Sequence, residues 1–144
     1  MELALSPNVT GRPTEFPAAV LAGLLVRTPD GRTHSRRWEG MIDTGADLLV
    51  LPVEIAEELR LVQTRQRVRV WTYRKDDRPS ERYVCFVKLV LPSNLEVLTK
   101  AITSERRNIL IGRSALVRMR LMIDWPANVW SLEDASFREA GKQE

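Results

Sequence analysis

The sequence predicts one all-β domain, a small barrel or folded sheet of short strands with one or two short helices. Short stretches that are rich in Val, Ile and Leu, or that alternate apolar and polar residues, recur between clusters of turn-forming residues. Only two short stretches show the spacing of an amphipathic helix. The length of 144 residues and a composition that is 44% hydrophobic and 28% charged suit a single globular domain.

The first part of the chain is expected to form a β-hairpin followed by a helix. Residues 18–28 are apolar and rich in Val and Leu, residues 29–32 (PDGR) supply turn chemistry, and residues 33–42 form the second strand. Pro52 suits the first position of a helix, because its missing N–H would have no partner there. The helix at residues 53–61 then places apolar side chains on one face and three glutamates on the other.

The middle of the chain is expected to alternate strands and turns. Residues 67–73 alternate in character from one position to the next, as a half-buried strand does. A polar turn at residues 75–80 (KDDRPS) leads to a strand at residues 83–91. Residues 92–94 (PSN) then turn the chain into another strand at residues 95–102.

The last part of the chain is expected to contain three brief strands and the second helix. Residues 109–111 (ILI) form a short apolar strand that ends at a glycine. Ser114 can cap a helix at residues 115–120. Residues 121–124 and 129–132 then form a final pair of strands.

Both ends of the chain are expected to lie outside the domain. Residues 1–17 contain three prolines and a glycine without a sustained periodicity, which predicts an irregular N-terminal arm. Residues 133–144 are polar and predict a frayed C-terminal tail. The domain itself is therefore expected to span residues 18–132.

Membrane and nucleic-acid functions are not expected. The longest nearly apolar run, residues 16–26, contains a proline and a glycine and is shorter than the roughly 18 to 20 residues that cross a bilayer. The N-terminal residues lack the basic start and apolar run of a secretory signal, so we expect a cytoplasmic protein. The net charge of +3 comes mainly from arginines interspersed with acids, which predicts a mixed, solvated surface.

No metal ion or other cofactor is expected. Cys85 is the only cysteine and His34 the only histidine, so the chain can form neither an intramolecular disulfide nor a zinc site of the usual ligands. Cys85 lies between two apolar residues, which predicts a buried strand thiol. Asp76 and Asp77 are expected to be solvated turn residues.

The strongest chemical signal is residues 40–51, GMIDTGADLLVL, which place Asp43 among apolar residues. A carboxylate there is costly unless its charge or its proton is held. Two carboxylates in contact can share one proton, so that one activates water as a general base while the other donates a proton to the scissile carbonyl. Thr44 can hold such a loop by hydrogen bonds, and Gly45 lets backbone amides approach the carboxylate. A turn aspartate that enters a glycine kink is the simpler alternative.

Two motifs resemble those of the retropepsin-like aspartic proteases, the clan that includes the retroviral proteases. Residues 41–47 (MIDTGAD), followed by Leu51-Pro52, resemble the active-site loop of that family. Residues 108–113 (NILIGR) match its second hallmark, an apolar pair and a glycine at the end of a late strand before a short helix. The resemblance covers about residues 18–132 and implies a retropepsin-like acid protease barrel that hydrolyses polypeptides.

The resemblance also implies a role for each residue of the motifs. Asp43, Thr44 and Gly45 would form the catalytic triplet, in which Asp43 is the acid/base and Thr44 links the two active-site loops. The turn at residues 75–80 would be the flap over the substrate, although the chain has no glycine between Gly45 and Gly112, where the viral enzymes have a glycine-rich tip. Gly112 and Arg113 would support the loop, with Arg113 as the ion-pair partner of Asp47. Substrate contacts are expected from Ala46, Asp47, Trp71, Thr72, Tyr73 and Ile111.

The active unit is expected to be a homodimer. The sequence contains no second Asp-Thr-Gly or Asp-Ser-Gly triplet, so one chain supplies one catalytic carboxylate. The second Asp43 must then come from another copy across a two-fold axis. Residues 129–132 could pair with the partner in this dimer. A catalytically inactive dimeric adaptor that binds peptides is the alternative function, and a basic protein associated with nucleic acid is a third.

Overall fold

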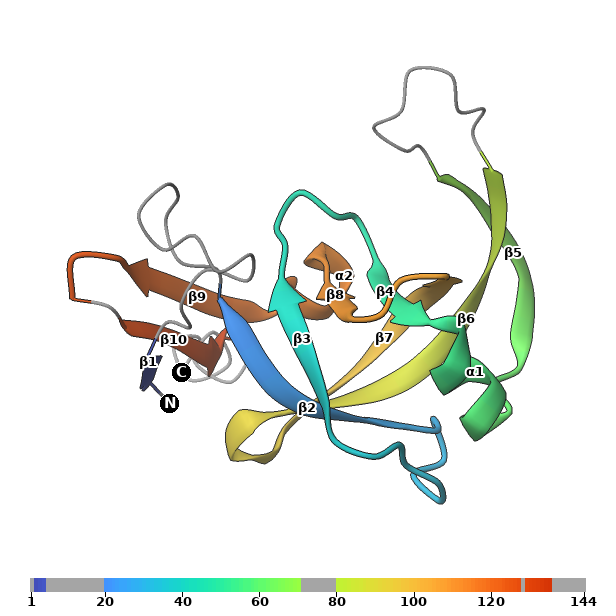
Figure 1. The fold of residues 1–144 in the computed structure, drawn as a ribbon, viewed down its shortest axis with the longest axis horizontal. Coiled ribbons are helices and arrows are strands. Elements are labelled where there is room, and N and C mark those ends of the chain that lie inside the picture. Colours follow the sequence, from blue (N-terminus) through green and yellow to red (C-terminus); the bar gives the residue numbers. More distant parts are fainter. Residues whose placement is uncertain (1, 5–19, 71–79, 128, 136–144) are drawn as a thin grey trace, which may run out of the picture.

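The computed structural model describes residues 2–4, 20–70, 80–127 and 129–135 (Figure 1). Most of the described residues lie in strands, as the sequence predicts. The elements are, in chain order, β1 (Glu2–Ala4), β2 (Leu21–Arg27), β3 (Trp38–Ile42), β4 (Leu49–Pro52), α1 (Val53–Leu59), β5 (Gln63–Val70), β6 (Ser80–Leu91), η1 (Pro92–Asn94), β7 (Leu95–Ser104), β8 (Ile109–Ile111), α2 (Arg113–Leu116), β9 (Met119–Asp124) and β10 (Val129–Asp134).

Six strands close into a barrel in the order β2-β3-β8-β4-β7-β6, and the pairing of β6 with β2 completes the ring. The fifth strand, β5, pairs with β6 outside this ring. Closure removes the unpaired edges that an open sheet would expose. The predicted all-β barrel with two short helices is confirmed.

The connection between β3 and β4 positions the site, because these consecutive strands are not neighbours. Strand β8 lies between them, parallel to β3 and antiparallel to β4. Ile42, the last residue of β3, pairs with Ile111, the last residue of β8. The chain must therefore cross the end of β8 to reach β4, and residues 43–48 make that crossing.

The barrel interior is filled by aliphatic side chains from nearly every strand and from one face of α1. Their alternation along each strand sends every second residue inward. Burying an aliphatic side chain of this size contributes about 1.5–3 kcal/mol, so these residues supply most of the stabilisation. The fully buried members include Leu24, Val26, Leu49, Leu51, Ile55, Val87, Leu89, Ile109 and Ile111.

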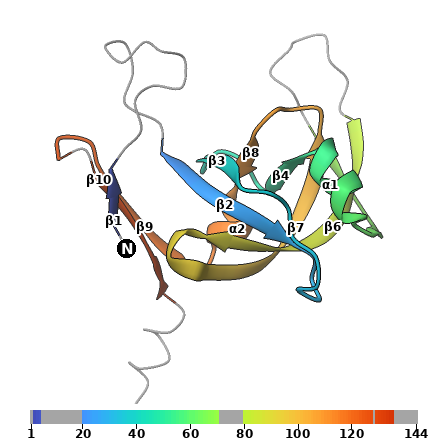
Figure 2. The ribbon, with the colours of Figure 1, turned by 60° about the horizontal axis from the view of Figure 1, so that its bottom comes forward.

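Three strands form a second, smaller sheet in the order β1-β10-β9, all antiparallel. Figure 2 shows this sheet as a separate layer beside the barrel. The prediction of irregular structure for residues 1–17 is therefore wrong for residues 2–4; residues 5–17 lie outside the described part of the chain. Glu133 and Asp134 belong to β10, so the tail begins later than predicted.

The position of β10 changes the expectation for residues 129–132. Strand β10 has β1 on one side and β9 on the other, so its backbone groups are paired within the chain. The prediction that these residues pair with a partner is not supported by this arrangement. The outer edges of this sheet are those of β1 and β9.

Several predicted boundaries shift. Helix α1 ends at Leu59, and Arg60 then adopts a left-handed conformation with φ of 51°. The predicted helix at residues 115–120 is wrong: α2 spans Arg113–Leu116, and Met119 begins β9. Strand β3 is shorter than the predicted 33–42, and β5 begins at Gln63, before the predicted start. Of the predicted flap turn at residues 75–80, residues 75–79 lie outside the described residues, and Ser80 begins β6.

Cys85 is buried in β6 and free, as predicted. Burial raises the pKa of its thiol, so the reactive thiolate is disfavoured. No helix among the described residues is long and apolar enough to cross a membrane.

Candidate active site

The loop of residues 43–48 crosses the end of β8 and is held to it by main-chain hydrogen bonds. The Asp43 amide donates to the carbonyl of Ile111 over 3.1 Å. The Ala46 amide donates to the carbonyl of Asp43 over 3.1 Å, which closes a tight turn at the top of the loop. The first of these hydrogen bonds extends the backbone pairing of β3 with β8 by one residue. The second closes a turn that begins at Asp43.

The Asp43 carboxylate sits at the start of this turn. Its Oδ1 accepts a hydrogen bond of 3.0 Å from the amide of Gly45. Asp43 is half-buried, whereas Thr44 and Gly45 are exposed. The predicted approach of a backbone amide to the carboxylate is therefore present, and the amide belongs to Gly45 itself. One oxygen of the carboxylate is held and the group remains reachable from solvent.

Gly112 lies directly beneath the loop. A Cβ atom added at this position would lie 2.2 Å from the carbonyl oxygen of Leu48 and 2.8 Å from that of Ala46. Both contacts are with backbone, so no side-chain rotation could relieve them. The position therefore requires glycine, and the predicted packing of Gly112 behind the loop agrees with the structure.

The start of α2 donates two further hydrogen bonds to the loop. The Arg113 amide donates to the carbonyl of Ala46 over 2.9 Å, and the Ser114 amide donates to that of Asp47 over 3.0 Å. These amides have no partner within the helix because they belong to its first turn. The two motifs of the sequence are thus joined in space by backbone contacts.

Arg113 and Asp47 form the ion pair that the family resemblance implies. Their side chains are 60% and 82% exposed. An exposed pair of this kind contributes only about 0–1 kcal/mol to stability. Its main effect is to orient both side chains beside the loop.

The Ser114 side chain does not cap the helix as predicted, but joins three elements. Its Oγ accepts a hydrogen bond of 3.0 Å from the amide of Leu49 at the start of β4 and donates to the carbonyl of Lys100 over 3.2 Å. The Thr99 hydroxyl, which is 4% exposed, donates to Ser114 Oγ over 3.0 Å. Sequence analysis missed this network, because Leu49 and Ser114 are 65 residues apart.

Replacing Ser114 by alanine is expected to lower the free energy of unfolding by about 1–3 kcal/mol, because the Leu49 amide loses its part-buried partner, whereas the Thr99 hydroxyl can still donate to the carbonyl of Lys100 over 3.1 Å. Denaturant unfolding monitored by tryptophan fluorescence measures this change. Ser104→Ala is the matched control, since the Ser104 Oγ accepts a hydrogen bond from an exposed amide, that of Arg106. Equal stability of the two variants would contradict the assigned role.

The remaining predicted residues have different outcomes. Ile111 has no exposed surface, so it lies behind the loop and has no side-chain surface with which to contact a substrate. Trp71, Thr72 and Tyr73 lie outside the described residues. Within the described part of the chain, no group of three His, Cys, Asp or Glu side chains is placed to hold a metal ion.

Solved structures of similar shape identify the fold. A retropepsin-like aspartic protease from Rickettsia conorii is similar with a TM-score of 0.58 and 18% identity, over 92% of this chain and 89% of that chain. The foamy viral protease-reverse transcriptase, solved with double-stranded DNA, is similar with a TM-score of 0.50 and 17% identity, over 71% of this chain and 16% of that chain. Compared by sequence, the chain matches no family model and no curated protein. The chain therefore has the fold of the retropepsin-like aspartic proteases, as its two motifs predict.

Proposed function

We propose that this protein is an aspartic endopeptidase whose active site contains two Asp43 side chains, one from each subunit of a homodimer. The observation that carries the proposal is the placement of the Asp43 carboxylate, which is half-buried on a loop that the Gly112 segment holds from behind. A fold can outlive its activity, so the site carries more weight than the likeness of the barrel.

The proposed reaction needs no metal ion and no covalent intermediate. One Asp43 carboxylate takes a proton from water, and the water oxygen attacks the scissile carbonyl carbon. The second, protonated Asp43 donates its proton to the carbonyl oxygen, which gives a neutral tetrahedral intermediate. The Asp43 that took the proton from water then donates it to the amide nitrogen, while the other Asp43 takes a proton from a hydroxyl of the intermediate. The C–N bond breaks to give a carboxylic acid and an amine, and the two carboxylates again share one proton.

The dimer is proposed because the reaction uses two carboxylates and each chain has a single Asp-Thr-Gly triplet, that of Asp43. The Thr44 side chain is exposed beside Asp43, where a second copy of the loop could accept its hydrogen bond. Gly45, Ala46 and Asp47 follow on the same loop and are proposed to bind the substrate main chain. Within the described part of the chain, the outer edges of β1, β9 and β5 are unpaired, and we propose that those of β1 and β9 pair between subunits.

Incubation of the purified protein with an unfolded, reduced and alkylated protein tests this function. We expect fragments at acidic or near-neutral pH, and we expect a transition-state analogue of peptide hydrolysis to suppress them. Sedimentation equilibrium at micromolar concentration is expected to report a dimer. A dimer that binds the unfolded protein without cutting it would instead establish a peptide-binding adaptor.

A further inference from the structure

Exposed apolar side chains gather on one side of the barrel. Val62 is 82% exposed, Leu98 is 58% exposed and Phe86 is 39% exposed. They come from the α1–β5 connection, from β7 and from β6, and they line one groove with a volume of about 690 Å³. Isolated exposed apolar residues are ordinary, but a group of them around a depression is typical of an interaction surface.

This groove is separate from the candidate active site. Its lining includes no residue of the loop at residues 43–48 and none of α2. Figure 1 shows that loop at the top of the barrel, whereas the β2–β3 turn and α1, which border the groove, lie at the lower right. An occupant of the groove would therefore leave the Asp43 loop uncovered.

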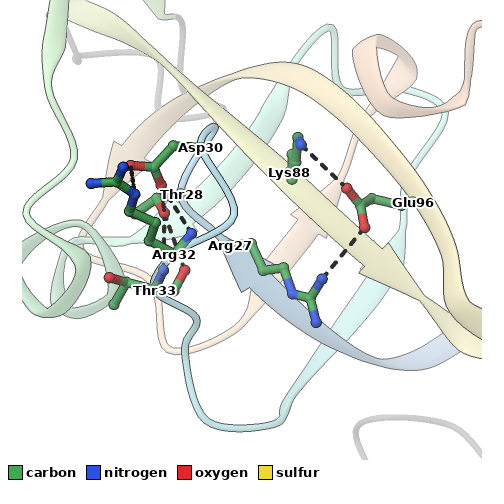
Figure 3. A network of polar contacts seen from close by, with 7 residues as sticks. All are labelled: Arg27, Thr28, Asp30, Arg32, Thr33, Lys88 and Glu96. Carbon is green, nitrogen blue, oxygen red and sulfur yellow. Dashed lines mark hydrogen bonds and ion pairs between the residues drawn. The ribbon is translucent and has the colours of Figure 1, made fainter.

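One wall of the groove is the β2–β3 turn, which is held by its own hydrogen bonds (Figure 3). Asp30 Oδ1 accepts from the Thr28 hydroxyl over 2.6 Å and from the Arg32 amide over 3.0 Å. The hydrogen bond from the Thr28 hydroxyl lowers the pKa of the Asp30 carboxyl most, and the hydrogen bond from the Arg32 amide lowers it further. The carboxylate is thus occupied within the turn, and the wall is preformed.

The opposite wall is the end of α1. The Arg60 amide donates to the carbonyl of Glu57 over 3.2 Å, and the Leu61 amide donates to that of Ala56 over 3.0 Å. These hydrogen bonds cap the C-terminus of α1, where Arg60 adopts the left-handed backbone conformation. The Arg60 side chain lines the groove from this fixed position, beside Leu61.

The groove has an excess of unpaired positive charge. Arg60 lines it, and Lys100 lies beside it as the cross-strand partner of Phe86. Neither of these two cations forms an ion pair with another residue in the described part of the chain. By contrast, Arg27 and Lys88 nearby share the Glu96 carboxylate, each at 3.6 Å (Figure 3).

We propose that this groove docks an extended polypeptide segment in which apolar side chains alternate with acidic ones. The apolar side chains would occupy the floor between Val62, Phe86 and Leu98, and the acidic ones would meet the unpaired cations. The site does not depend on the proposed catalysis, and would serve either to dock a substrate away from the cleavage site or to recruit a partner.

A peptide fits the groove better than single-stranded nucleic acid does. Binding of unpaired bases relies on aromatic rings with open faces on which they stack. The groove offers one aromatic ring, Phe86, among aliphatic side chains. The nearby Tyr83 ring is engaged by the guanidinium of Arg67, which lies 4.9 Å from the ring centre.

Fluorescence polarisation tests the proposal on the Asp43→Asn protein, so that cleavage cannot interfere. The probe is a fluorescein-labelled twelve-residue peptide in which Leu and Phe alternate with Glu. We expect saturable binding at micromolar concentrations. A peptide with Lys in place of Glu, and one with Ser in place of Leu and Phe, are expected to bind at least about tenfold more weakly, because each lacks one half of the recognition.

Two groove variants and two matched controls locate the binding. Leu98→Glu and Arg60→Glu are each expected to weaken binding of the acidic peptide at least about tenfold. Val117 and Arg106 are also exposed but lie outside the groove. Val117→Glu and Arg106→Glu are therefore expected to leave the affinity for the acidic peptide within about twofold of that of the parent protein. Thermal unfolding verifies that all four variants fold. Absence of saturable binding, equal effects of groove and control variants, or tighter binding of a labelled twelve-nucleotide oligothymidylate would each overturn the proposal.

Discussion

Asp43→Asn is expected to abolish peptide hydrolysis and to leave the fold and the dimer intact. The substitution keeps the size of the side chain, and the amide oxygen can still accept the hydrogen bond from the Gly45 amide. An amide cannot take a proton from water or return one, so the dimer loses both its base and its acid. We expect kcat/KM to fall by a factor of roughly 10³ or more. A fluorogenic peptide assay on the purified dimer measures this change.

The control for this experiment is Asp124→Asn, an equivalent change away from the loop. Asp124 lies at the end of β9, where its carboxylate accepts a hydrogen bond from the Ala127 amide. This variant is expected to retain activity within about twofold. If the Asp43→Asn dimer still cleaved the peptide at a rate comparable to wild type, the proposed chemistry would be wrong.

Gly112→Ala is expected to have the largest effect on stability. The added methyl group would lie 2.2 Å from the Leu48 carbonyl oxygen and 2.7 Å from its carbonyl carbon, well inside van der Waals contact. Gly112 has a φ of −82°, which alanine also adopts, so the expected loss is steric alone. We expect the free energy of unfolding to fall by about 3 kcal/mol or more, a large part of the 5–15 kcal/mol typical of a domain.

Denaturant unfolding of Gly112→Ala beside Gly23→Ala tests this expectation. A Cβ atom at Gly23 would also be close to a neighbour, 2.8 Å from Nη2 of Arg37, but that neighbour is the end of a flexible side chain. The Gly23 variant is therefore expected to unfold near the wild-type midpoint. Similar midpoints for the two variants would show that the loop can move away from Gly112, against the packing described here.

Sequence patterns located most of the strands but not their partners. The apolar runs that became β6, β7 and β8 were identified to within a few residues, because inward and outward side chains alternate along a strand. The same patterns could not show that β8 separates β3 from β4, since pairing depends on contacts between residues far apart in the chain. Strand β1 was missed because three residues are too few to show a periodicity.

The candidate site was predicted in part. The Asp-Thr-Gly loop could be located because it is contiguous in the sequence, and the resemblance of the two motifs to those of the retropepsin-like proteases implied the ion pair between Arg113 and Asp47. The bond between Ser114 and the Leu49 amide could not, since a serine ahead of a predicted helix equally suggests a cap. Only the packed structure shows which hydrogen bond that hydroxyl makes.

By itself, the sequence determined that this chain forms a β domain with one Asp-Thr-Gly triplet, and therefore one Asp43 carboxylate of this kind in each copy. Those properties reside in side-chain alternation and in a short contiguous motif, which do not require knowledge of distant contacts. The tertiary structure alone decided that the loop crosses the end of β8 and rests on Gly112, and that exposed apolar residues from α1–β5, β6 and β7 meet in one groove. The physical reason is that both features depend on which distant strands pair, and local preference does not encode that pairing.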